Sequence, residues 1–133
     1  MRAFGQALGV SACLLFHAGD AQAIELNGAW ASNAAACSKV LTKRGDRIVV
    51  EKDADLYRSG FVIDQNQIRG KILTCAIKTR KEDGAFIHLL ALCSNDVVLQ
   101  NYQFSVKPDG EDKITRIFPG LPELDTPYHR CLP

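Results

Sequence analysis

The sequence predicts an all-β domain, mainly antiparallel, built as a small meander barrel or sandwich of seven or eight strands with one short helix and two disulfides. Short apolar runs are separated by turn residues about every 8–14 positions, a spacing typical of β-sandwiches and barrels. Many of the apolar residues are Val and Ile, whose branched side chains favour strands. Strands that follow one another this closely are expected to pair in chain order, and closure into a barrel removes exposed edges.

Residues 1–23 predict a secretion signal, and residues 24–133 predict a single domain. A basic residue precedes an apolar stretch (residues 7–16), and residues 21–23 form an Ala-x-Ala cleavage site. The alternative is a lipoprotein signal ending at Cys13, but the apolar run continues past that cysteine, which favours simple cleavage. We therefore expect a periplasmic or secreted protein, without a transmembrane span once the signal is removed.

The first elements of the domain are a strand, a helix and a second strand. The first strand is expected at Ile24–Ser32. A helix is expected over Asn33–Leu41, because Asn33 is a good N-cap and three alanines follow it. Residues 43–46 then turn the chain into a short strand at Arg47–Glu51.

The clearest hairpin lies at Gly60–Lys71. A two-residue turn at Gln65-Asn66 places Ile63 opposite Ile68, so that two apolar side chains meet on one face. Such a turn needs a positive φ, which Asn66 tolerates.

A second hairpin joins Ile72–Arg80 to Ala85–Cys93 through residues 81–84. Alternate residues of a strand share one face of the sheet. The inward faces are therefore expected to carry Leu73, Cys75 and Ile77 from the first strand, and Ile87, Leu89, Ala91 and Cys93 from the second.

The remaining strands are expected at Val97–Val106 and Lys113–Phe118, separated by a Pro-Asp-Gly turn. Residues 119–127 hold three prolines and a glycine, which predicts a long irregular loop. Tyr128–Cys131 is expected to add a last pairing at an edge.

Cys37, Cys75, Cys93 and Cys131 remain after the signal, in a compartment where thiols oxidise. Four cysteines allow three pairings. We favour Cys75–Cys93, which joins adjacent strands, and Cys37–Cys131, which ties the helix to the C-terminal tail. Metal binding or thiol chemistry is disfavoured, because there is no C-x-x-C and no His at ligand spacing from a Cys.

The charge balance and motif content disfavour several function classes. The chain has 16 Lys and Arg against 15 Asp and Glu, so a nucleic acid or an anionic membrane is not an expected partner, and we expect a monomer. No serine lies in a G-x-S-x-G setting. Glu51, Asp53 and Asp55 suggest either a calcium loop or a solvated turn, and the EF-hand glycine and glutamate are missing. We therefore expect a protein without enzymatic activity, metal or cofactor.

The function that remains is binding, in one of two forms. In the first, a small apolar ligand occupies the barrel interior, and the pocket candidates are Trp30, His88, Gln100, Tyr102 and Arg116. The alternative for His88 is a half-buried histidine with a hydrogen-bond partner. In the second form, an inhibitor, envelope or structural protein contacts a partner such as an envelope protein through the proline-rich loop, at Pro119, Leu121, Pro122 and Leu124.

Gly28-Ala29-Trp30 resembles the opening of lipocalin-like (calycin) barrels. The resemblance implies that Trp30 closes one barrel end and that a basic residue of a late strand packs over its ring. Arg116 is the first choice for that residue, and Lys113 is the other. The same opening, with Cys37 after the Trp, is similar to periplasmic inhibitors of secreted metalloproteases. Their flexible N-terminal inhibitory segment has only residues 24–27 as its counterpart here, which disfavours that mode of inhibition.

As a whole, residues 24–133 are most similar to uncharacterised secreted proteins of Gram-negative bacteria. The shared segments are Gly28 to Trp30, Asp53 to Tyr57, Ile68 to Lys71, Cys75, Cys93, Ile114 to Arg116, Phe118 to Gly120 and Tyr128 to Cys131. This resemblance covers nearly the whole domain and implies no particular activity.

Overall fold

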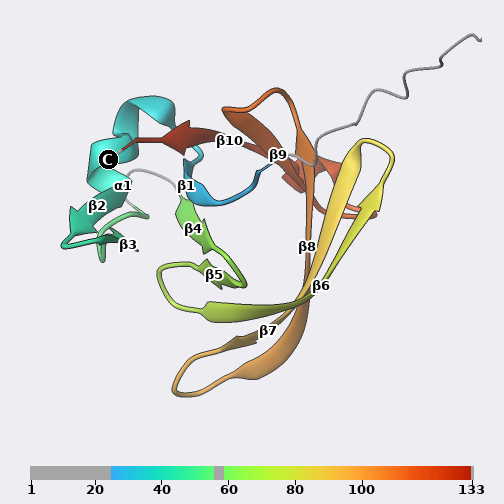
Figure 1. Ribbon diagram of the computed structural model, residues 1–133, viewed down its shortest axis with the longest axis horizontal. Helices are drawn as coiled ribbons and strands as arrows, with labels where there is room; N and C mark the ends of the chain where they lie inside the picture. Colours follow the sequence, from blue (N-terminus) through green and yellow to red (C-terminus); the bar gives the residue numbers. More distant parts are fainter. Residues whose placement is uncertain (1–24, 56–58, 133) are drawn as a thin grey trace, which may run out of the picture.

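The chain forms a closed, antiparallel eight-stranded barrel in the computed structural model (Figure 1). The structure describes residues 25–55 and 59–132. The expected secretion signal (residues 1–23) and Cys13 lie outside the described residues.

The barrel strands follow one another in chain order, and each pairs with the next. They are β1 (Gly28–Ala31), β4 (Gly60–Asp64), β5 (Gln67–Arg69), β6 (Thr74–Asp83), β7 (Phe86–Ser94), β8 (Leu99–Pro108), β9 (Lys113–Ile117) and β10 (Thr126–Cys131). The short strand β1 lies between β4 and β10 and so closes the barrel. The all-β meander barrel predicted from the sequence is confirmed.

The chain leaves the barrel between β1 and β4 and packs on its outside (Figure 1). A 3-10 turn (Ala34–Ala36), helix α1 (Cys37–Val40) and the hairpin of β2 (Leu41–Arg44) and β3 (Arg47–Val50) make up this excursion. Asn33 is the N-cap of the 3-10 turn, since its Oδ1 accepts a hydrogen bond from the Ala35 N–H at 3.1 Å, and an N-cap at this residue was expected. The expected helix, however, ends before Leu41, where β2 begins. Strand β2 was not expected, because it is only four residues long and ends in the basic residues Lys43 and Arg44.

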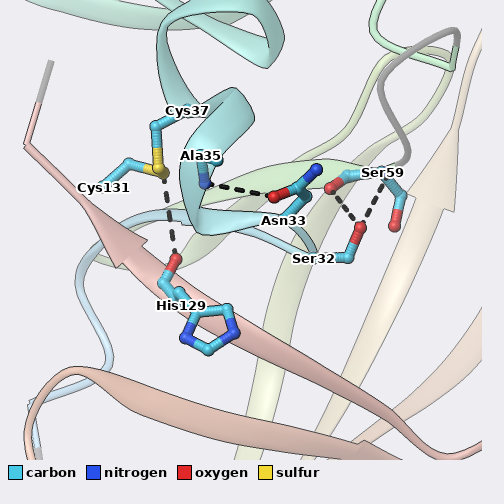
Figure 2. Close-up of a disulfide and its surroundings, with 7 residues drawn as sticks. All are labelled: Ser32, Asn33, Ala35, Cys37, Ser59, His129 and Cys131. Atoms are coloured by element: carbon cyan, nitrogen blue, oxygen red, sulfur yellow. Dashed lines mark hydrogen bonds between the residues drawn. A yellow bond between two sulfur atoms is a disulfide. The ribbon is translucent and has the colours of Figure 1, made fainter.

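A small second core lies between this excursion and the barrel wall. It contains Ala29 and Ala31 of β1, Val40 of α1 and Val62 of β4, all buried. Gly60 is required here by close approach, because an added Cβ would overlap a methyl group of Val40. The disulfide between Cys37 and Cys131 fixes α1 to the end of β10 (Figure 2), with 5.7 Å between the Cα atoms.

The barrel interior is packed by alternate residues of its strands. The inward faces expected for the β6–β7 hairpin are confirmed, and Cys75 and Cys93 lie opposite each other and form the second disulfide. Both disulfides are thus the pairs favoured from the sequence. Phe61 packs edge-on against Phe104 and Tyr128, with ring centroids 5.1 and 4.8 Å apart.

Several turns and boundaries differ from expectation. Ile63 does face Ile68, but Gln65 rather than Asn66 adopts the positive φ of the turn (52°). The β6–β7 ribbon runs further than expected, so that Asp83 pairs with Phe86. The last strand is no edge, because β10 pairs with both β9 and β1 and starts at Thr126, inside the expected loop.

A basic residue does pack over the Trp30 ring at one end of the barrel, but that residue is Arg130. Trp30 is fully buried and donates its Nε1–H to the Leu26 carbonyl at 3.0 Å. The Arg130 guanidinium lies 4.3 Å from the centre of the indole. The expectation that Arg116 or Lys113 has this role is wrong, because the register of β1 with β10 places Arg130 directly opposite Trp30.

Backbone carbonyls hold the Arg130 guanidinium over the ring. It donates to the carbonyls of Asn27 at 2.6 Å, Glu25 at 2.9 Å and Glu111 at 3.0 Å. Gly28 leaves room for it, because an added Cβ would lie 2.5 Å from Arg130 Nη1 and the φ of +141° disfavours other residues. Arg130 therefore explains the Gly-x-Trp pattern, because the glycine leaves room for the guanidinium and the Trp ring packs against it.

Replacing Cys37 and Cys131 together by Ala should lower the free energy of unfolding more than replacing Cys75 and Cys93. The first bond links residues 94 apart and the second links residues 18 apart. Chain-entropy arguments give about 4–5 kcal/mol for the long loop and about 3 kcal/mol for the short one. Urea unfolding of both double variants measures the difference, and equal losses or the reverse order would contradict the expectation.

Arg130→Lys should lower the free energy of unfolding by about 1–3 kcal/mol, because an ammonium keeps the charge but not the planar fork that reaches three carbonyls. Arg47→Lys, at an exposed position of β3, is the matched control and should change nothing measurable. The measurement is the urea midpoint of each variant. An unchanged midpoint for Arg130→Lys would show that the fork does not stabilise the barrel.

Candidate functional site

A cavity of about 250 Å³ lies inside the barrel at the end opposite to Arg130. Its wall is mainly apolar and aromatic. The principal lining side chains are those of Phe61, Ile68, Leu73, Tyr102, Phe104 and Tyr128. The Cys75–Cys93 disulfide and Ala91 complete one side. The barrel thus carries the Trp30–Arg130 pair at one end and this mainly apolar cavity at the other.

The cavity continues into a wider hollow at the barrel mouth, of about 730 Å³, with which it shares Ser59, Gly60, Gly70 and Leu73. An ion pair between Lys71 and Asp55 lies at this mouth, with Nζ 2.7 Å from Oδ1. The hydrogen bond from Lys71 lowers the pKa of the Asp55 carboxyl.

Arg116 is the one charged side chain among the described residues that line the inner cavity. Its guanidinium lies over the rings of Phe104 and Phe118, 4.6 and 4.7 Å from their centres. It also donates a hydrogen bond to the Tyr102 hydroxyl at 3.0 Å. Aromatic contacts of this kind hold the cation in one position.

Two further hydroxyls meet at the mouth and partner each other. Ser59 Oγ lies 2.8 Å from the Tyr128 hydroxyl. Ser59 is itself tied to the end of β1, because its backbone N–H donates to Ser32 Oγ at 3.1 Å and its carbonyl accepts from Ser32 (Figure 2). These bonds fix the start of β4 beside the cavity.

The five pocket residues expected from the sequence are not all brought together. Tyr102 and Arg116 line the cavity. Trp30 lies at the opposite end, under Arg130, and Gln100 is exposed and does not line the cavity. His88 faces away from the interior, because it alternates with the buried residues Ile87 and Leu89. The expectation that His88 lines the pocket is therefore wrong.

His88 instead forms a polar cluster on the outer face of β7 and β8. Its Nδ1 lies 2.8 Å from Ser105 Oγ, which also accepts a hydrogen bond from Gln103 Nε2 at 3.0 Å. Ser105 is only 1% exposed, so its hydroxyl has no access to a substrate. The cluster satisfies buried polar groups of the wall, as the alternative hypothesis for His88 expected.

Sequence reasoning missed Phe61, Leu73, Ser59 and Tyr128 as cavity residues. The inward alternation of the β6 and β7 strands marked Leu73 and the cysteines as interior residues, but not as neighbours of an empty space. Tyr128 was not recognised as an interior residue, because the strand that carries it was expected at an edge of the sheet.

A buried arginine outside the cavity joins the excursion to the barrel wall. Arg69 is 7% exposed and donates to the Ile48 carbonyl at 2.7 Å, while its Nε has no hydrogen-bond partner. Burial lowers the pKa of Arg69, as does the charge of Arg47, whereas Asp64 opposes this shift. The contact anchors β3 over β5.

Two of the three acidic residues of the predicted calcium loop or solvated turn, Glu51 and Asp55, pair with basic side chains. Glu51 Oε1 lies 3.3 Å from Arg44, and Asp55 pairs with Lys71. Over residues 25–55 and 59–132, no three His, Cys, Asp or Glu side chains gather in an arrangement suited to a metal ion.

The loops at the open end carry exposed apolar side chains. The loops after β5, β7 and β9 leave the same end of the antiparallel barrel. In the expected contact loop, Leu121 and Leu124 are about half exposed, and Pro122 starts a 3-10 turn (Pro122–Leu124) after the exposed Pro119. The most exposed apolar residues of the other two loops are Ile72, Val97 and Leu99.

No family model, curated protein or solved structure matches this chain. In the described part of the chain, none of the helices has the length and apolar character needed to cross a bilayer. The two disulfides are compatible with an extracellular or other oxidising compartment.

Proposed function

We propose that the protein is an exported, non-enzymatic binding module that holds a small, mainly apolar molecule in the open end of its barrel. The observation that carries this proposal is the mainly apolar hollow of about 250 Å³ inside the barrel, behind an open mouth. Protein interiors are otherwise close-packed, so an apolar space of this size supports a binding role.

The size and chemistry of the hollow support this proposal. An eight-stranded barrel is just wide enough either to be filled by its own side chains or to hold one small molecule. Ligand pockets are typically about 300–1,000 Å³ and mostly apolar, with a few placed polar groups. The inner cavity and its mouth together reach this range, and Arg116 and Tyr102 supply the polar groups.

The resemblance of the Gly28–Trp30 segment to lipocalin-like barrels points the same way. Lipocalins are eight-stranded up-and-down barrels, which is also the strand order here. We include periplasmic or secreted localisation and a monomeric state in the proposal, and the disulfides support the former.

Titration with the neutral fluorescent probe N-phenyl-1-naphthylamine tests the proposal. The protein should bind the probe saturably at one site. Ala91→Leu should weaken binding by about tenfold or more, because three added carbons then occupy the cavity. Ala76→Leu adds the same atoms to the outer side of the adjacent strand and should leave affinity unchanged. Absence of saturable binding, or equal loss in both variants, would refute the cavity as a ligand site.

A second candidate function, contact with a partner protein, is favoured by the exposed apolar residues at the mouth. Val97 is 89% exposed, and Leu121 and Leu124 are 49% and 48% exposed. Apolar groups gathered at one end of a small domain are typical of interaction sites. The proline-rich loop that presents two of them is held in shape by a hydrogen bond from the Phe118 N–H to Asp125 at 2.8 Å.

Cross-linking in the cells that naturally make the protein tests this second candidate. Replacing Leu121 and Leu124 together by Ser should abolish a defined cross-linked complex. Leu132→Ser, at a 93% exposed position beyond the far end of β10, is the matched control and should leave the complex intact. A complex that survives the loop variant, or no complex at all, would exclude a partner at this loop.

A further inference from the structure

We propose that the molecule in the barrel is an amphipathic carboxylic acid, whose carboxylate binds Arg116 at the mouth while its apolar part fills the cavity. This inference rests on the proposed binding function and narrows its ligand class. It comes from the position, the rigidity and the unpaired charge of a single arginine.

The first step is the position of Arg116. Its register partner on β8 is Val106, which is fully buried, so the Arg116 side chain lies on the inner side of the barrel wall. It lines the cavity beside Tyr102, which is 37% exposed. The guanidinium therefore lies between the apolar interior and solvent, where the polar end of an amphipathic molecule would come to rest.

The second step is the charge of Arg116. Among the described residues no carboxylate lies within 4.0 Å of it, whereas Arg130 at the opposite end pairs with Asp112 at 3.6 Å and with three carbonyls. One of its N–H groups binds the Tyr102 hydroxyl. A guanidinium has five N–H donors, so donors remain for a ligand. Next to an apolar wall, water screens such a charge less than in bulk solvent, which strengthens its attraction for an anion.

The geometry of the Arg116 guanidinium also fits a carboxylate. The planar guanidinium lies over the rings of Phe104 and Phe118, with its centre 4.6 and 4.7 Å from their centres. A fixed planar fork matches a carboxylate with two parallel hydrogen bonds. The other polar groups of the cavity, the hydroxyls of Ser59 and Tyr128, already partner each other. Arg116 is thus the group that selects the head of the ligand.

Displacement of bound N-phenyl-1-naphthylamine by decanoate and by decan-1-ol tests the inference, because the two probes differ only in the head group. We expect decanoate to bind about 10- to 100-fold more tightly than decan-1-ol, the range of a charge-assisted hydrogen-bond pair. Arg116→Gln should remove this preference by weakening decanoate alone, and Arg116→Lys should retain part of it. Lys113→Gln removes the same charge from the same strand and should leave the preference intact.

The outcomes separate the two proposals. Saturable binding with equal affinity for decanoate and decan-1-ol would overturn the carboxylate inference and leave the apolar cavity standing. Failure of all three probes to bind would overturn the proposed function itself. Loss of decanoate binding in Lys113→Gln as well as in Arg116→Gln would show a general charge effect and not a head-group site. If Arg116→Gln does not fold, the preference of the unmodified protein still decides the question.

Discussion

The pairing of β1 with both β4 and β10 is the constraint on which the rest of the structure depends. The strand has only four residues, yet it closes the barrel by joining the first part of the chain to the last. The same register places Arg130 over Trp30 and brings Cys131 near Cys37. A pairing between segments about a hundred residues apart costs much loop-closure entropy, and the long disulfide offsets part of that cost by restricting the unfolded chain.

Closure of this kind makes the two ends of the barrel unequal. At one end a fully buried indole packs against an arginine that donates to three backbone carbonyls. At the other end the rings of Phe61, Phe104 and Tyr128 stand around a space that they do not fill. The two arginines, Arg130 and Arg116, both lie over aromatic rings, but Arg130 donates to three backbone carbonyls whereas Arg116 donates to the Tyr102 hydroxyl. The same chemistry thus fixes a structural cation at one end and leaves a binding group at the other.

Features that depend on neighbouring residues could be predicted from the sequence, as could the long-range Cys37–Cys131 disulfide, but the register of strands distant in the chain could not. The register of the Gln65-Asn66 hairpin and the inward faces of β6 and β7 follow from local alternation and turn residues, and the structure confirms them. The N-cap at Asn33 likewise depends only on neighbouring residues, and the structure confirms it. The arginine over Trp30 was assigned wrongly because it is set by the β1–β10 register, which no local pattern encodes. The alternation of buried residues in β7 already placed His88 on the outer face of the barrel. The expectation that His88 lines a pocket conflicted with this pattern.

The cavity also bears on the stability of the domain. Side chains that line an empty space lose packing contacts on one side, so a hollow core is less stable than a filled one. In this barrel the missing packing contacts are those of the cavity wall near the mouth. There the Cys75–Cys93 disulfide and the backbone hydrogen bonds between β1 and β4 hold the wall independently of side-chain packing. The wall can therefore keep its shape while the space stays open. A molecule that enters it supplies the missing contacts and binds only the folded state, so ligand binding and folding reinforce each other.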